Sequence, residues 1–348
     1  IDYTNGCGQL LLEPQRTNLI TQSEDFSTWS LSNAATITSS SITSPSGASD
    51  AYEIQASTTI SRIQQSLSLS GTHTQSLFVK YAGSDTVVLV GRNTANTSIK
   101  INVTSSGVTI NTVESNVDSY SITEINNGWY KITITALAFS YFQIWIDTVD
   151  GNGNLYIWGA QVELGSYPTS YIPTSGTTVT RIEDRSVTTG ISSSIGQTEG
   201  VLNVKFVFNK IDGNKYITLR RNTATDERIY IGIVASNMSV GSIVNGTVIF
   251  ASGSFALTEG VTYNLAFAYK LNDYAFYMNG VSVYTNTSAV APTFMDALYL
   301  AANGGGPYYF TYPIHFINLF KTRLTDEQLT DLTGTVHTSF NSLATSLG

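Results

Sequence analysis

The sequence is dominated by short segments in which apolar and polar residues alternate, separated by clusters of Gly, Asn, Ser and Asp. An alternation with a period of two residues is typical of β-strands that bury one face, and β-branched and aromatic side chains suit such strands. The segments of the first half lie at 77–81, 86–90, 99–103, 129–135 and 141–147. Those of the second half lie at 201–208, 215–220, 228–234 and 263–270. Many strands without intervening helices indicate antiparallel sheets.

Two local motifs refine this prediction. Asn279-Gly280 separates two alternating runs, and this dipeptide favours a type I′ hairpin because both central residues need a positive φ. One short helix is expected from Thr325, where Gln328 three residues later completes a capping box. The predicted fold class is therefore all-β, with two tandem antiparallel β-sandwich (jelly-roll) domains.

Composition supports a folded chain with an unusual surface. Charged residues make up 12% of the chain, against about 25% in an average soluble domain. The 20 Tyr and 15 Phe residues exclude disorder, because they supply ample apolar surface for a core. Ser and Thr are abundant, and we expect them on the exposed faces of the strands, where Thr fits the pleated surface well.

Charge and hydropathy exclude several classes of partner. The net charge is −8 and no basic cluster occurs, so nucleic acid is not an expected partner. The sequence contains no run of about 18 apolar residues, so insertion into a membrane is not expected. The sequence starts at Ile1 without a signal peptide, which we interpret as a fragment or a processed product. Cys7 is the single cysteine, so no disulfide within the chain is expected.

The amino-acid composition changes between the two halves of the chain. Ser, Thr and the excess of acidic residues are concentrated before about residue 200, and segment 186–198 is typical of a linker or a loosely held strand. We therefore expect two domains, at residues 1–183 and 184–348.

Two sets of segments resemble known families. Residues 10–29 and 156–181 resemble the opening and the close of a β-sandwich module common in bacteriophage tail and virion proteins, which is similar to jelly-roll carbohydrate-binding modules. Residues 193–208, 263–284 and 314–332 resemble the first strand, the hairpin and the closing strand of laminin-G or concanavalin-like lectin domains. The resemblance implies non-catalytic binding of a polysaccharide or cell-surface glycan, on a virion surface or outside the cell. It also leaves room for a homo-oligomer within a larger virion assembly.

The strongest candidate binding surface lies in segment 141–147, YFQIWID. If Phe142, Ile144 and Ile146 face the core, then Tyr141, Gln143, Trp145 and Asp147 share the opposite face. Aromatic rings with an amide and a carboxylate suit a shallow glycan site, but a neighbouring subunit could cover the same face. Trp129 and Trp158 lie in segments that match the resembled family, so we expect them to be packing residues, and Trp29 to be partly buried.

Weaker candidates complete the set. Tyr308 and Tyr309, followed by Tyr312, lie in a Gly- and Pro-containing loop that could bind glycans in the second domain. Oxygen ligands at Asp147, Asp150 and Asn152 could hold calcium, although a simple turn explains the same residues. No other cofactor is expected.

Two alternative functions stay open. A structural virion decoration or scaffold protein would use the exposed aromatic face to contact another subunit. A polysaccharide-cleaving enzyme would need two carboxylates at a defined separation. The adjacent acidic pairs of the sequence do not supply this geometry, because neighbours on a strand point to opposite faces, and we expect each pair to be solvated: Glu24-Asp25, Glu183-Asp184, Asp226-Glu227 and Asp326-Glu327. His73, His315 and His337 lack the spacing of a zinc site, and His315 is expected to be a sheet residue.

Overall fold

The computed structural model describes residues 12–58, 61–91, 97–137, 139–147, 153–208, 214–234, 236–300 and 310–334. The chain forms two compact units, and each is described by itself. The first unit is Gln15–Ile182, so it ends next to the expected boundary at residue 183. The second unit begins at Glu183 and also includes Leu12–Pro14. Leu12 packs in the core of the second unit. The Asp184 backbone N–H donates to Glu13 O at 2.9 Å, and the Glu13 backbone N–H donates to the side-chain Oδ2 of Asp184 at 3.0 Å.

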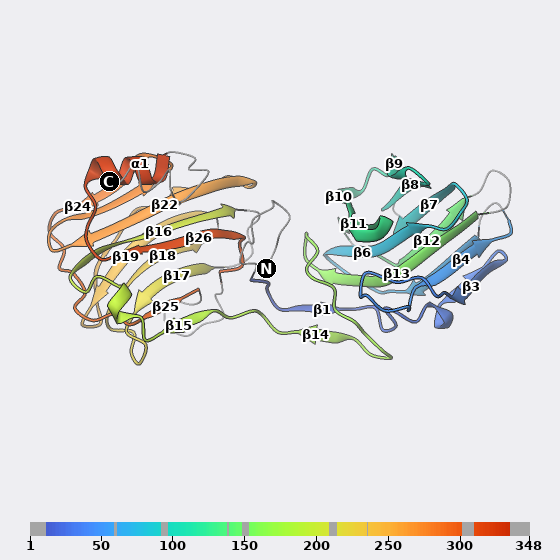
Figure 1. Cartoon of the computed structure of the whole chain (residues 1–348), viewed down its shortest axis with the longest axis horizontal. Helices are drawn as coiled ribbons and strands as arrows, with labels where there is room; N and C mark the ends of the chain where they lie inside the picture. The colour runs from blue at the N-terminus through green and yellow to red at the C-terminus, as the bar shows by residue number, and fades with distance from the viewer. Residues whose placement is uncertain are drawn as a thin grey trace. The chain divides into compact units, whose positions relative to one another are not determined.

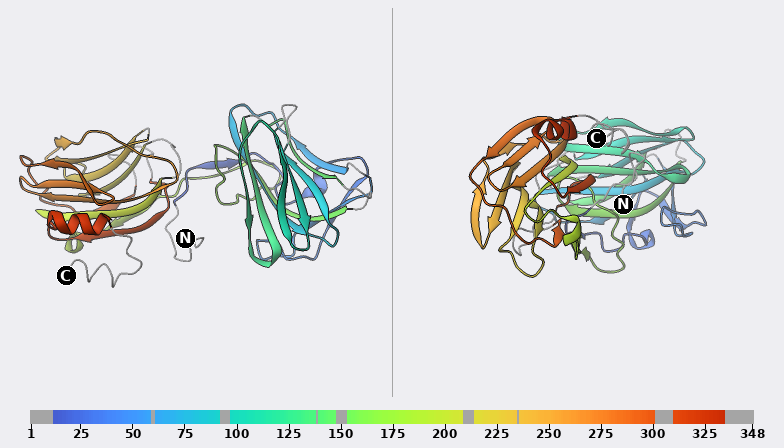
Figure 2. Two further views of the ribbon diagram at one scale, coloured as in Figure 1. Left: turned by 90° about the horizontal axis from the view of Figure 1, so that it is seen from above. Right: turned by 60° about the vertical axis from the view of Figure 1, so that its left-hand side comes forward.

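The first unit is a sandwich of two six-stranded sheets in which every strand pairing is antiparallel (Figures 1 and 2). The first sheet contains, in spatial order, β10 (Val117–Glu124), β11 (Trp129–Leu137), β6 (Thr72–Tyr81), β13 (Gly153–Leu164), β4 (Tyr52–Ala56) and β3 (Ala35–Ser39). The second contains β2 (Ser30–Ser32), β5 (Ser61–Ser66), β12 (Tyr141–Asp147), β7 (Thr86–Gly91), β8 (Ser98–Thr104) and β9 (Gly107–Val113). Short elements complete the unit: β1 (Arg16–Asn18) paired with β14 (Val179–Arg181), and the 3₁₀ turns Phe26–Thr28 and Asn126–Gly128.

The core of the first unit lies between these two sheets. Leu77 and Leu155 of the first sheet and Val88 and Ile144 of the second belong to one buried cluster. Each of these strands alternates between this cluster and the opposite face, as the period-two pattern predicted.

The second unit is also an antiparallel sandwich (Figure 1). Its larger sheet contains β15 (Val187–Thr189), β25 (Ala297–Tyr299), β17 (Lys215–Arg220), β18 (Arg228–Val234), β19 (Asn237–Val244), β20 (Thr247–Ala251) and the short β21 (Phe255–Ala256), which pairs with β19. Its smaller sheet contains β24 (Val281–Asn286), β23 (Tyr274–Met278), β22 (Val261–Lys270), β16 (Glu199–Phe208) and β26 (Ile314–Phe320). A 3₁₀ turn at Ser192–Ser194 follows β15.

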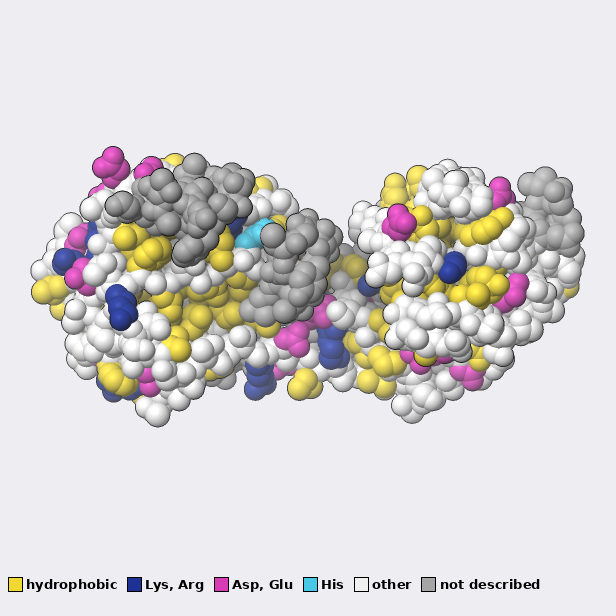
Figure 3. All heavy atoms as spheres, viewed as in Figure 1, with side chains coloured by type: hydrophobic (Ala, Val, Ile, Leu, Met, Phe, Trp, Pro, Cys, Tyr) yellow, Lys and Arg dark blue, Asp and Glu magenta, His cyan; other side chains and the backbone are white. Residues whose placement is uncertain are grey.

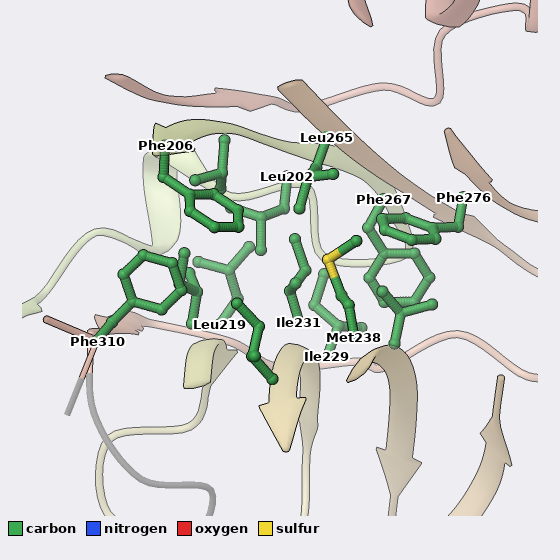
Figure 4. Packing of buried hydrophobic residues seen from close by; sticks show 14 of the residues in the cluster. Leu202, Phe206, Leu219, Ile229, Ile231, Met238, Leu265, Phe267, Phe276 and Phe310 are labelled. Atoms are coloured by element: carbon green, nitrogen blue, oxygen red, sulfur yellow. The ribbon is translucent and has the colours of Figure 1, made fainter. Parts of the chain in front are cut away.

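Figure 4 shows how the two sheets of the second unit meet. Leu202 and Phe206 of β16 face Leu219 of β17 and Ile229 of β18 across the interior, and all four are at most 1% exposed. The fold class predicted from the sequence, two antiparallel β-sandwiches, is confirmed.

One helix, α1 (Asp326–Gly334), covers the outer side of the smaller sheet, where Leu329 and Leu332 pack in a buried cluster with Ala266 of β22 (Figure 2). Its capping box is confirmed. The Gln328 backbone N–H donates to Thr325 Oγ1 at 3.2 Å, and the Thr325 N–H donates to Gln328 Oε1 at 3.0 Å.

The predicted hairpin is confirmed as well, because Asn279 and Gly280 have φ values of 49° and 84° between β23 and β24. Figure 3 shows few charged side chains among a surface that is mostly neutral. Within the described part of the chain, no helix is long and apolar enough to cross a membrane.

Candidate functional site

Strand β12 divides its side chains between core and surface as the alternation predicted. Phe142, Ile144 and Ile146 are each 0% exposed and belong to the core of the first unit. Tyr141 and Trp145 are half-buried on the opposite face of the sheet. Gln143, between them, is only 4% exposed, because its amide is held by its neighbours on this face.

A chain of hydrogen bonds fixes the indole of Trp145. Its Nε1–H donates to Gln143 Oε1 at 3.1 Å, and Gln143 Nε2 donates to Gln64 Oε1 at 2.5 Å. The guanidinium carbon of Arg62 lies 5.4 Å from the centroid of the Trp145 ring, within the range of a cation–π contact. The tryptophan is therefore oriented by its neighbours on the strands before a ligand arrives.

Strand register explains why these side chains meet. Arg62 and Gln64 of β5 pair directly with Trp145 and Gln143 of β12, so their side chains share one face. On the other side, Leu89 of β7 pairs with Trp145, and it is 5% exposed although it does not belong to the core cluster. The row continues from Leu89 to Lys100 of β8 and Thr112 of β9.

We refer to Arg62, Gln64, Tyr141, Gln143 and Trp145 as the β12 face. Tyr141 and Trp145 are four residues apart on one strand, so their Cα atoms are about 13 Å apart at about 3.3 Å per residue. The face thus offers two aromatic side chains, amides that both donate and accept, and a guanidinium. Such a set can stack against a ring and bind hydroxyl or carboxylate groups at its edge.

Sequence reasoning identified Tyr141, Gln143 and Trp145 but missed Arg62 and Gln64. The segment RIQQ (62–65) has the alternation of a strand, so the sequence predicts which of its side chains face outward. It does not predict that β5 lies next to β12, because pairing between distant strands depends on the packing of the whole sandwich.

Several predicted site residues lie outside the described residues: Tyr308, Tyr309, Asp150, Asn152 and the side chain of Asp147. The calcium expectation rests on that set, and it stays a prediction. Nearby Asn154 has a structural role, because its Oδ1 accepts from Ser84 and its Nδ2 donates to Glu53 Oε1 and Ala82 O. Among the described residues, no group of three or more His, Cys, Asp or Glu side chains is arranged to hold a metal ion.

Two expectations about single residues were wrong. Tyr312 was expected in an exposed loop, but it is 3% exposed and its ring stacks on Phe206 with centroids 5.8 Å apart. Glu227 was expected to be solvated, but it is 1% exposed. Its carboxylate accepts the backbone N–H groups of Asn245 at 3.3 Å and Thr293 at 2.9 Å, which compensates for its burial.

The remaining tryptophans and His315 have the expected environments. Trp29, Trp129 and Trp158 are buried at 5%, 1% and 4% exposure, and the first two donate their indole N–H to backbone carbonyls. His315 lies in β26 and is half-buried, and this burial lowers its pKa. Trp145 is therefore the only tryptophan of the chain that is not buried.

A pocket of about 280 Å³ in the first unit is lined by three acidic side chains, Glu24, Asp25 and Asp50, among neutral ones. Burial raises the pKa of Glu24, and the nearby Asp50 adds to this effect. The hydroxyl of Ser27 lowers the pKa of Asp25, which caps the first 3₁₀ turn and accepts from Tyr52 at 2.9 Å. These contacts give Asp25 a structural role, so the pair is not a free acid and base.

Comparisons with known proteins found no matching family model and no matching curated protein. Among solved structures, the chain is similar to the CBM40 module of a Ruminococcus gnavus IT-sialidase bound to alpha2,3 sialyllactose, at 12% identity and a TM-score of 0.34, over 41% of this chain and 86% of that one. Sheep galectin-11 in complex with glycerol is similar at 8% identity and a TM-score of 0.29, over 40% of this chain and 99% of that one. The leech intramolecular trans-sialidase is similar at 17% identity and a TM-score of 0.33, over 42% of this chain and 24% of that one. Similarities with scores this low assign no function to this chain.

Proposed function

We propose that this protein binds carbohydrate without cleaving it, through the β12 face of the first unit. The observation that carries the proposal is the half-exposed, prearranged Trp145, held by Gln143 and flanked by Arg62. The C–H groups of a pyranose face carry partial positive charge, so they pack favourably on the negative face of an indole ring. A side chain fixed before binding also loses less conformational entropy when a ligand orders it.

An amide of the face would supply specificity. Gln143 is buried and held by Trp145 and Gln64, whereas the partly exposed Gln64 keeps donor and acceptor capacity beyond the bond that it accepts from Gln143, and sugar hydroxyls need both. The hydroxyl-rich, weakly charged surface of the chain suits a neutral ligand. The separation of Tyr141 and Trp145 favours an oligosaccharide over a single sugar, because one ring cannot cover both side chains.

We further propose that this binding serves adhesion to a host surface, with the protein displayed outside the cell or on a virion. The support is the resemblance of residues 10–29 and 156–181 to virion modules. A shallow site of this kind binds weakly by itself, and repeated copies raise the overall affinity through effective concentration. Binding of monomeric and tetramerised protein to whole bacterial cells tests this role, since only the tetramer should be retained after washing.

A glycan array with three proteins tests the binding proposal. We expect Trp145→Ala to lose at least about tenfold in affinity, or about 1.4 kcal/mol, because the stacking surface is removed. Tyr120→Ala is the matched control, since Tyr120 is 45% exposed on β10 in the other sheet. Equal binding by all three proteins would contradict the site. A stable oligomer that hides Trp145, with no array signal, would instead favour a structural role for this face.

A further inference from the structure

The larger sheet of the second unit carries aromatic and basic side chains on its outer face. In β17 and β18, Leu219 and Ile229 point into the core. Thr218, Arg220, Arg228 and their strand neighbours alternate with these residues and therefore share the outer face. We refer to Tyr216, Thr218, Arg220, Arg228, Tyr230 and Tyr299 as the β17–β18 face.

Two tyrosines of this face lie against glycines. A Cβ on Gly232 would lie 2.5 Å from Cε1 of Tyr216, and a Cβ on Gly241 would lie 2.3 Å from the hydroxyl of Tyr230. Only glycine therefore leaves room for rings that lean across the sheet onto the next strand. The two rings approach edge to face with their centroids 6.0 Å apart, so they form one continuous aromatic surface.

Two arginines lie beside this surface and directly opposite each other. Arg220 and Arg228 are register partners in the antiparallel pair β17–β18. Like charges in this arrangement repel each other, which costs stability unless something neutralises them. Neither residue forms an ion pair with the described residues, and the pKa of Arg228 is lowered by its burial and, to a smaller extent, by the charge of Arg220.

The neighbouring carboxylates are bound elsewhere. Asp226 pairs with Arg221 at 3.3 Å, and Glu227 accepts two backbone N–H groups away from this face. Asp296 accepts the backbone N–H of Asn222 at 2.5 Å. The two arginines are therefore left without a counter-charge among the described residues, which is unexpected in a chain whose net charge is −8.

Two further observations concern polar atoms beside this aromatic surface. The hydroxyl of Thr218, whose strand partners are Tyr230 and Tyr299, is buried and lacks a hydrogen-bond partner among the described residues. The Nε atoms of Arg220 and Arg228 are buried without a partner as well. The guanidinium carbon of Arg220 lies 3.7 Å from the centroid of the Tyr299 ring, so this contact holds the guanidinium at the edge of the aromatic surface.

We propose that the β17–β18 face binds an acidic saccharide, with its carboxylate or sulfate between Arg220 and Arg228 and its sugar ring against Tyr216 and Tyr230. Arginine side chains match the planar geometry of such anions and bind them through charge-assisted pairs of hydrogen bonds. The anion removes the repulsion between the two guanidinium groups. This site lies in the second unit, so it is separate from the β12 face and does not depend on it.

Isothermal calorimetry with matched polymers tests the proposal: polygalacturonate against its methyl ester, and dextran sulfate against dextran. We expect the protein to bind polygalacturonate, dextran sulfate or both, and to bind more weakly at higher salt. The neutral counterpart of each bound polymer should not bind. The double variant Arg220→Gln/Arg228→Gln should lose at least about tenfold in affinity. A carboxylate or a sulfate preference shows which anion the site accepts.

The matched control removes two positive charges elsewhere in the same unit. Arg185 and Lys270 are 65% and 50% exposed, and Arg185→Gln/Lys270→Gln should leave binding unchanged. Trp145→Ala should also retain binding of the acidic polymer, so failure of one site is distinguishable from failure of the other.

A folding control accompanies these variants. Because Arg220→Gln/Arg228→Gln relieves repulsion, its urea midpoint should not fall below that of the wild type, and Tyr216→Ala provides a second variant for the binding measurement. Equal binding of acidic and neutral polymers, equal loss in the control, or no binding of either acidic polymer would overturn the proposal.

Discussion

At the residue scale, the adjacent carboxylates Glu24 and Asp25 have pKa values that their surroundings shift in opposite directions. Burial raises the pKa of Glu24, whereas the hydroxyl of Ser27 lowers that of Asp25. A carboxylate with a raised pKa in the folded state favours folding most when it is protonated. Its contribution is complete below the ordinary value of 4.5 and is lost as the pH rises through the folded pKa.

The variant Glu24→Gln tests this sign. Glutamine carries no charge to bury and none to repel Asp50, so the variant should have a higher free energy of unfolding than the wild type at pH 7. The difference should shrink as the pH falls and vanish below about pH 4.5. Urea denaturation between pH 3 and pH 7 measures it, and a difference that is constant over this range would show that charge is not its cause.

The burial of a single polar side chain was the feature that the sequence predicted least well. The burial of Trp129 and Trp158 follows from the segments in which they lie, and the structure confirms it. Glu227 is buried because Asn245 and Thr293, from two other segments, supply its hydrogen-bond donors. Those donors are distant in sequence, so the pattern around Glu227 itself contains no sign of them.

At the element scale, two tight turns have the same local chemistry and different surroundings. Asn279-Gly280 joins β23 to β24, and Asn245-Gly246 joins β19 to β20, with positive φ at all four residues. A Cβ on Gly280 would lie 2.9 Å from the Cα of Gly334, the last residue of α1, whereas one on Gly246 would meet nothing within 4 Å.

These turns supply a matched pair of variants. Both Gly246→Ala and Gly280→Ala place a side chain in the left-handed region, which costs on the order of 1 to 3 kcal/mol. Gly280→Ala should destabilise the second unit more, because it also pushes α1 from the sheet. Urea denaturation followed by circular dichroism compares them, and equal losses would show that the turn and α1 do not press on each other.

Elements themselves were predictable, whereas their neighbours were not. Alternation predicted β12 with Tyr141, Gln143 and Trp145 on one face, because a strand has only two faces. The pairing of Trp145 with Arg62, and of Arg220 with Arg228, depends on the register between strands. Register follows from packing of the complete sandwich, so these three arginines were assigned to the two candidate sites only from the structure.

At the scale of the whole molecule, tryptophan fluorescence comes from the first unit and not from the second. All four tryptophans lie in the first unit, and only Trp145 is not buried. Quenching of tryptophan fluorescence by acrylamide therefore reports on the β12 face, while the second unit does not contribute. A ligand on the first unit and one on the second can be told apart in the intact chain.

The most direct test of carbohydrate binding at the β12 face is acrylamide quenching with and without the strongest array glycan. If a glycan binds at this face, it should protect the wild-type protein from quenching, because a sugar ring covers Trp145. In Trp145→Phe, where the three buried tryptophans remain, the same glycan should change quenching very little. Binding at the β12 face would be contradicted if a saturating glycan left quenching of the wild type unchanged, or if protection persisted in Trp145→Phe.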